Sequence, residues 1–173
     1  FGNLEIAYAI EESPLGTGGA IRGALRFTAD DGEPVWVMNG DTIVDLSFDD
    51  MWRAHGARPS RERDITMALK SVDDGSRFGS VEIRNDRVSA FSAVGHTGRS
   101  LINSGVYLLE RNVFDARPMP VAFSFESGTD PMRLGIGPVL EEQRPASDGQ
   151  HHKVDFAIII EICFLPQLNT EGI

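Results

Sequence analysis

A glycine cluster at residues 15–19 (Leu-Gly-Thr-Gly-Gly) constrains the fold of this sequence most strongly, because it runs directly into apolar residues at helical spacing. The spacing predicts a helix over residues 18–27. An uninterrupted apolar run at residues 35–38 predicts a strand buried on both faces of a sheet, and the polar segment 39–42 (Asn-Gly-Asp-Thr) follows it at once. Open α/β sheets bind phosphorylated ligands at such strand ends and helix starts. The pattern therefore favours an α/β fold with a ligand site at one sheet edge.

The composition narrows the class of partner. The chain has 173 residues, of which 41% are hydrophobic, and this is enough for one domain with a real core. Its net charge of −10 argues against binding to nucleic acid or to an anionic membrane surface. The single cysteine, Cys163, excludes an intrachain disulfide and favours a reducing, cytoplasmic setting. The longest apolar run, residues 156–160, is too short to span a bilayer.

Further elements alternate along the chain. Residues 47–50 form a capping box that predicts a helix to about residue 57, and residues 78–92 predict a hairpin that turns at Asn85-Asp86. Additional strands are predicted at residues 4–10, 65–69, 101–109 and 154–165. Residues 127–149 are rich in glycine, proline and charge, and their pattern does not place them in the fold. The alternation of helix and strand predicts an α/β sandwich.

Each candidate site residue has two interpretations. The glycine cluster is either a nucleotide cradle or a plain turn into a helix. Asp41 is either a magnesium ligand or a turn residue. Asn103 is unfavourable within a strand, so it should be hydrogen-bonded in place or face a polar ligand, and Gly105 beside it could mark a bulge. His151-His152 cannot easily chelate one ion from a strand, and neither a zinc-type ligand spacing nor a serine-hydrolase elbow is present.

Four segments in order, residues 11–20, 39–42, 78–81 and 102–109, resemble the sugar-1-phosphate nucleotidyltransferases. Within that group the sequence is most similar to the heptose-1-phosphate guanylyltransferases, and residues 123–126 (Phe-Ser-Phe-Glu) add to the narrower match. Mannose-1-phosphate guanylyltransferases and uridylyl- or thymidylyltransferases remain close alternatives. The resemblance implies a Rossmann-like nucleotide-diphospho-sugar transferase sandwich with a mixed, mainly parallel sheet. Residues 1–126 would be the nucleotidyltransferase domain without its first strand and loop, and residues 127–173 a less certain C-terminal segment of it.

The resemblance also implies roles for individual residues. The residues implied to bind the nucleotide are Leu15, Gly16, Thr17, Gly18, Gly19 and Gly40, and those implied to bind the sugar are Gly79, Asn103 and Glu126. Asp41 would be the catalytic residue and would ligate Mg²⁺, with Asp155 as a second candidate metal ligand. The partners would be a nucleoside triphosphate, with GTP favoured, and a sugar 1-phosphate.

The sequence departs from the family at three places. The family's Gly-Thr-Arg loop and its later lysine, which neutralise the leaving pyrophosphate, are absent from this sequence. Ala93 and Val94 stand where a Glu-Lys pair would grip the sugar phosphate, and only Asp155 echoes the late metal-binding segment. We therefore expect NDP-sugar formation as the underlying chemistry with little turnover by this chain alone. The rival interpretation is a nucleotide- or sugar-binding module that performs no transfer.

Overall fold

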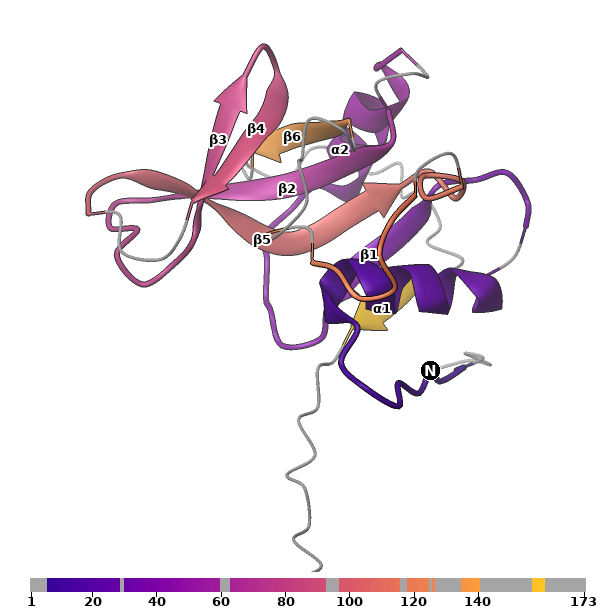
Figure 1. Ribbon diagram of the computed structural model, residues 1–173. Coiled ribbons are helices and arrows are strands. Elements are labelled where there is room, and N and C mark those ends of the chain that lie inside the picture. Colours follow the sequence, from indigo (N-terminus) through magenta and orange to yellow (C-terminus); the bar gives the residue numbers. More distant parts are fainter. Residues whose placement is uncertain are drawn as a thin grey trace, which may run out of the picture.

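The computed structural model describes residues 6–28, 30–59, 63–92, 97–115, 118–124, 126, 135–140 and 157–160 (Figure 1). Two α-helices, one 3-10 helix and seven strands occur in these residues. In chain order they are α1 (Gly16–Ala24), η1 (Leu25–Phe27), β1 (Val35–Asn39), α2 (Phe48–Gly56), β2 (Ile65–Val72), β3 (Ser80–Arg84), β4 (Arg87–Ser92), β5 (Ser100–Leu109), β6 (Ile136–Leu140) and β7 (Ala157–Ile160). None of the helices in these described ranges is long and apolar enough to cross a membrane.

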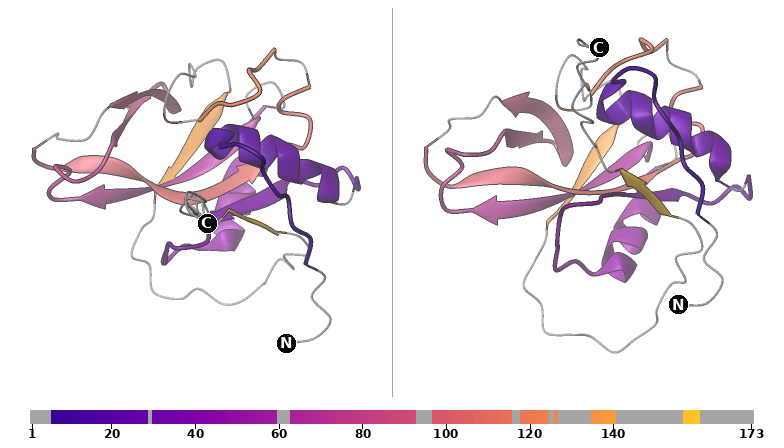
Figure 2. Two further views of the ribbon diagram at one scale, coloured as in Figure 1. Left: turned by 60° about the horizontal axis from the view of Figure 1, so that its bottom comes forward. Right: turned by 90° about the horizontal axis from the view of Figure 1, so that it is seen from below.

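The main sheet is mixed, with strand order β6-β2-β5-β1-β7. The β6–β2 and β1–β7 pairs are parallel, whereas β5 is antiparallel to both of its neighbours, β2 and β1. Four strands therefore run in one direction and β5 opposes them. Helices α1 and α2 lie on opposite faces of this sheet, as Figure 2 shows. The predicted Rossmann-like α/β sandwich with a mixed sheet is confirmed.

Strand β1 is an interior strand of the sheet, and its successive side chains enter two different hydrophobic cores. Val35 and Val37 pack with Ile21 and Leu25, which the α1–η1 segment supplies. Trp36 packs on the other face with Met51 of α2, and its ring meets Phe48 edge-on at a centroid distance of 4.9 Å. A strand covered on both faces must be apolar at every position, as the uninterrupted run predicted.

A bulge in β5 changes how its side chains are placed. The pairing with β2 moves from Met67↔Tyr107 to Leu69↔Asn103, so β5 contains two more residues than β2 over this stretch. Gly105 lies in the extra stretch with a φ of 74°, a conformation that glycine adopts without a steric penalty. The predicted bulge at Gly105 is confirmed, and it brings the side chains of Asn103 and Tyr107 together.

The hairpin and the second helix form as their local sequences predict. Asn85 and Asp86 both have positive φ, 51° and 58°, which is the type I′ geometry that suits a two-residue hairpin. The Ser47 side chain accepts a hydrogen bond from the backbone N–H of Asp50 at 3.2 Å, and α2 starts directly after it.

Three expectations about elements need correction. A strand was predicted at residues 4–10, but its described part, residues 6–10, is not a strand. Both edges of β1 are already paired, with β5 and β7, and residues 6–10 pair with no described strand. Helix α1 begins at Gly16, two residues earlier than predicted. Strand β6 was not predicted at all, since its Gly137 and Pro138 resemble a turn; proline is tolerated there because β6 is an edge strand. Within the predicted strand at residues 154–165, the described residues 157–160 form β7.

Candidate functional site

The glycine cluster lies directly under Phe123. The backbone N–H of Gly19 donates to the Phe123 carbonyl at 3.1 Å, and the Phe123 N–H donates to the Leu15 carbonyl at 2.8 Å. A Cβ added at Gly18 would stand 2.1 Å from the Phe123 ring, and one added at Gly16 would stand 2.6 Å from the Phe123 carbonyl oxygen. The missing side chains thus allow this close approach, while the nucleotide contacts implied for residues 15–19 stay a prediction.

Arg22, about one turn further along α1, binds the segment that contains Phe123. Its guanidinium donates to the carbonyls of Val121 at 3.0 Å and Met119 at 3.4 Å, and it lies over the Phe123 ring at 5.4 Å from the centroid. The Phe123 ring also meets Phe114 edge-on at 5.6 Å. Residues 119–123 are therefore held against α1, and this places Glu126 beside the start of that helix.

The Glu126 carboxylate joins the two halves of the candidate site. Thr17, at the start of α1, donates its hydroxyl to Glu126 Oε2 at 3.0 Å. From β5, the Asn103 amide donates to Glu126 Oε1 at 3.1 Å and the Tyr107 hydroxyl donates to the same oxygen at 3.2 Å. Thr17 belongs to the implied nucleotide half, whereas Asn103 and Glu126 belong to the implied sugar half. The structure therefore brings these three predicted residues into one hydrogen-bond network.

The backbone of the β5 bulge orients the Asn103 amide. Asn103 Oδ1 accepts the Gly105 N–H at 2.9 Å, so the amide nitrogen must face the other way, where it reaches the Tyr107 hydroxyl at 2.6 Å and Glu126. Asn103 is therefore hydrogen-bonded in place, as one of the two interpretations predicted, while its contact with a polar ligand stays a prediction. Burial, and then the nearby Glu126 carboxylate, raise the pKa of Tyr107 above its usual range, so its hydroxyl remains protonated.

A pocket of about 370 Å³ opens beside this network. Gly79, Asn103 and Glu126, the three residues implied to bind the sugar, all line it. Phe78, Phe91 and Ile102 contribute apolar walls. A Cβ at Gly79 would lie 3.1 Å from the Ser92 carbonyl oxygen, and glycine avoids this close contact in the pocket wall. Apolar walls with a few convergent polar groups are the usual features of a small-molecule site.

Asp41 lies just beyond the carboxyl end of β1. Asp41 and Gly40 are exposed, and the Thr42 hydroxyl donates to the Asp41 carboxylate at 3.2 Å. The adjacent Asn39 side chain covers Gly105, where an added Cβ would come within 2.5 Å of the Asn39 amide nitrogen. The end of β1 therefore lies beside the part of β5 that carries Asn103. Asp41, which follows β1, lies at the same end of these strands as the pocket.

Asp41 places an exposed carboxylate at this part of the site, where a metal ion could be bound. Among the described residues, no group of three His, Cys, Asp or Glu side chains is arranged to hold a metal. Mg²⁺ commonly uses one or two carboxylates and takes its other ligands from phosphate and water, so the exposed Asp41 carboxylate fits that ion when a nucleotide is bound.

Some predicted features fall outside the described residues, namely Asp155, Ala93, Val94 and the His151-His152 pair. Conversely, sequence reasoning missed Tyr107 and Arg22 as contributors to the site. Tyr107 is part of an apolar strand and gave no polar signal. Arg22 lies outside the apolar stripe of its helix, and this position was its one available signal.

Comparison of the sequence with known proteins identifies its family. A sequence profile of the nucleotidyl transferase family matches residues 1–144. The D-glycero-alpha-D-manno-heptose 1-phosphate guanylyltransferase of Aneurinibacillus thermoaerophilus is 39% identical over 130 residues, which are 73% of this chain and 54% of that protein. The enzyme of the same name from Campylobacter jejuni is 35% identical over 127 residues, 73% of this chain and 53% of that protein.

Solved structures share the fold of this chain. The crystal structure of HddC from Yersinia pseudotuberculosis superimposes with a TM-score of 0.59 at 29% identity, over 75% of this chain and 55% of that one. HddC has also been solved in complex with GMP-PN. The chain spans about half the length of these relatives. Because the family profile covers most of its residues, the chain belongs to the nucleotidyl transferase family.

Proposed function

We propose that this chain carries the nucleotide and sugar-phosphate binding parts of a guanylyltransferase that joins GTP to a heptose- or mannose-type sugar 1-phosphate. The Glu126 network carries the proposal, because it connects Thr17 at the start of α1 to Asn103 in the pocket wall. Its similarity to two heptose 1-phosphate guanylyltransferases supports the reaction class. The GMP-PN complex of HddC supports a guanine nucleotide. The single cysteine supports a cytoplasmic setting.

The proposed reaction is a direct substitution at phosphorus. A phosphate oxygen of the sugar 1-phosphate forms a bond to the α-phosphorus of GTP, the bond from that phosphorus to the β-phosphate oxygen breaks, and pyrophosphate leaves. Such a transfer needs alignment of the two substrates and neutralisation of charge, without a covalent enzyme intermediate.

Within this scheme each part of the chain has a separate role. Residues 15–19 and Gly40 hold the nucleotide, whereas Gly79, Asn103 and Glu126 hold the sugar hydroxyls. Asp41 would hold Mg²⁺, which supplies positive charge to the phosphates when it is bound. The Glu126 carboxylate, fixed by donors from both halves, keeps the sugar pocket in register with the nucleotide cradle.

A thermal-shift titration with GTP, UTP and dTTP, each with and without Mg²⁺, tests the proposal on the wild type and on Asp41→Ala. We expect a magnesium-dependent rise in melting temperature that is largest with GTP and is lost in Asp41→Ala. Asp45→Ala is the matched control, because it removes the same charge from the same exposed segment and should keep the response. Equal responses to all three nucleotides, or none, would contradict the proposal.

The same titration separates the transferase from the rival binding module. After GTP and Mg²⁺ have been bound, a sugar 1-phosphate is added and free pyrophosphate is measured. A transferase releases pyrophosphate only when both substrates are present, and we expect that release to be slow in this chain, because the sequence lacks the loop that neutralises the leaving pyrophosphate. A module that binds without transfer shows the temperature shift and no release above that of GTP alone.

A further inference from the structure

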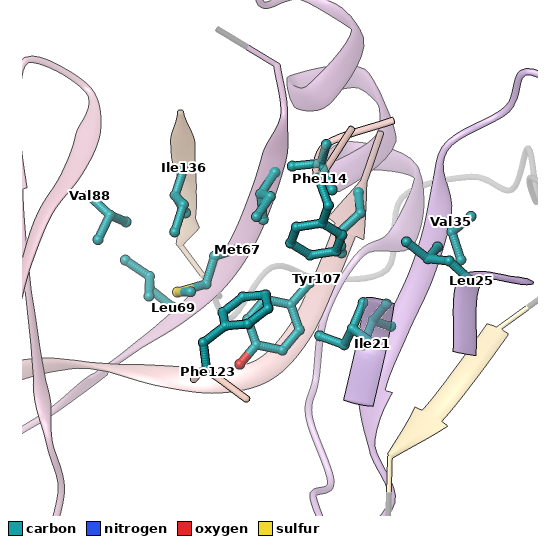
Figure 3. Packing of buried hydrophobic residues seen from close by; sticks show 14 of the residues in the cluster. Ile21, Leu25, Val35, Met67, Leu69, Val88, Tyr107, Phe114, Phe123 and Ile136 are labelled. Carbon is teal, nitrogen blue, oxygen red and sulfur yellow. The ribbon is translucent and has the colours of Figure 1, made fainter. Parts of the chain in front are cut away.

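Tyr107 lies in the core yet ends at the pocket. Its ring packs beside Phe123 and Ile21 in the core cluster, as Figure 3 shows, and the residue is only 1% exposed. Its hydroxyl reaches Asn103 at 2.6 Å and Glu126 at 3.2 Å, and both of those residues line the pocket. The aromatic ring thus belongs to the core, while its single polar atom belongs to the candidate site.

The structure assigns Tyr107 as a positioning residue, which fixes the Glu126 carboxylate in the orientation that receives the hydroxyl groups of a sugar phosphate. This inference deepens the proposed function and rests on it. Tyr107 itself does not line the pocket, so it acts through Glu126.

The count of donors and acceptors explains why a hydroxyl is needed at this position. Glu126 Oε1 receives Asn103 and Tyr107, and Oε2 receives Thr17. An ionised carboxylate has about four acceptor positions, so these three donors fix its orientation and leave capacity for a ligand hydroxyl. Without Tyr107, Glu126 would be held from β5 by the Asn103 amide alone.

A purely structural role would not need the oxygen. Phenylalanine would fill the same core space, and burying a hydroxyl is unfavourable unless it is hydrogen-bonded. The high pKa of Tyr107 keeps the proton on the hydroxyl, so it can donate to Glu126 throughout the neutral range. The contacts of this oxygen, rather than the packing of the ring, point to the positioning role.

Two measurements on the whole chain test the inference. The first is calorimetric binding of mannose 1-phosphate and of D-glycero-D-manno-heptose 1-phosphate to the wild type, Tyr107→Phe and Tyr8→Phe. Tyr8 is the chain's other tyrosine and is 78% exposed, which makes Tyr8→Phe the matched control. We expect Tyr107→Phe to weaken binding of a sugar phosphate by roughly threefold to tenfold, the value of one hydrogen bond, with GTP affinity unchanged.

The second measurement needs no ligand and does not depend on the stability of Tyr107→Phe. With tyrosine labelled at the ring carbon that bears the oxygen, the chain gives one resonance for Tyr8 and one for Tyr107. Replacement of the exposed Glu126 by glutamine should move the Tyr107 resonance and leave the Tyr8 resonance in place.

Each outcome has a distinct meaning. An unmoved Tyr107 resonance in Glu126→Gln, or equal sugar-phosphate affinity in the wild type and Tyr107→Phe, would overturn the positioning role alone. A wild type that binds neither sugar phosphate would overturn the proposed function, and the positioning role with it.

Discussion

At the scale of single residues, Gly18 shows how the site depends on one missing methyl group. The Phe123 ring fills the space where a Cβ would be, at 2.1 Å from its ideal position. Phe123 in turn belongs to the segment that leads to Glu126. A side chain at residue 18 would therefore displace the segment that closes the site.

We predict that Gly18→Ala lowers the free energy of unfolding by roughly 1–3 kcal/mol, because the buried ring must shift. Gly23→Ala is the matched control in the same helix, since an added Cβ there meets nothing within 4 Å. That control should stabilise the chain by about 0.5–1 kcal/mol through helix propensity. Denaturant unfolding measures both, and equal effects of the two substitutions would refute the packing account.

His55 is the second residue with a measurable consequence. It is 2% exposed, its Nδ1 lies 2.8 Å from the Thr66 hydroxyl, and its Nε2 lies 3.4 Å from Glu110 Oε1. Burial lowers the pKa of His55 from 6.5 to about 4, and the opposing effect of the Glu110 carboxylate does not compensate. His55 is therefore neutral in the folded protein at neutral pH.

This shift predicts acid sensitivity. Between about pH 6.5 and pH 4 the unfolded chain binds a proton at His55 that the folded chain does not, so stability falls as the pH is lowered through that range. The loss assigned to His55 is roughly 3 kcal/mol. The pH dependence of unfolding should be flatter in His55→Asn than in the wild type, and identical slopes would contradict the assignment.

Residue roles were predictable only where the residue type was unusual for its place. An asparagine and a glycine inside an apolar strand pointed to Asn103 and to the bulge at Gly105. Tyr107 gave no such signal, because a tyrosine in a strand is ordinary and its significance comes from the bulge that places Asn103 beside it.

At the scale of elements, helix α2 illustrates a local signal that was sufficient. The Ser47 side chain caps the helix, and Asp49 and Asp50 lie in its first turn, where negative charge is favourable. Met51 and His55, one turn apart, are its buried residues and face the sheet. The sequence alone therefore predicted both the start of α2 and its approximate end.

We predict that Ser47→Ala destabilises the chain by about 1 kcal/mol, because the Asp50 N–H loses its acceptor. Ser47→Asp restores an acceptor at the same position and should recover most of the loss. Thermal unfolding of the three proteins measures the effect. A Ser47→Ala protein as stable as the wild type would show that the cap contributes nothing.

Other elements could not be predicted because partners distant in sequence decide them. Residues 6–10 (Ile-Ala-Tyr-Ala-Ile) are apolar and contain residue types that favour strands, yet β5 and β7 flank β1 and residues 6–10 remain unpaired among the described strands. Strand β6 contains glycine and proline, and it forms because β2 offers a parallel partner from Ile65 to Leu69. The local sequence pattern does not reveal which strands will pair with β1 or that β2 has a free edge for β6.

At the scale of the whole molecule, three separate parts of the chain converge on one sheet edge. The start of α1 contributes Thr17, the β5 bulge contributes Asn103, and the segment docked by Arg22 contributes Glu126. Strand β1 ends beside them, since Asn39 packs over Gly105. The sequence predicted these parts individually, but the Glu126 link between them required the fold.

The central claim is that a nucleotide and a sugar phosphate occupy neighbouring places on this edge. Amide NMR spectra of the labelled chain, titrated separately with GTP plus Mg²⁺ and with mannose 1-phosphate, test it most directly. We predict that GTP shifts the signals of residues 15–19 and Gly40, that the sugar phosphate shifts those of Gly79 and Asn103, and that both ligands shift Glu126. Shifts confined to other parts of the chain, or no shift with either ligand, would contradict the account.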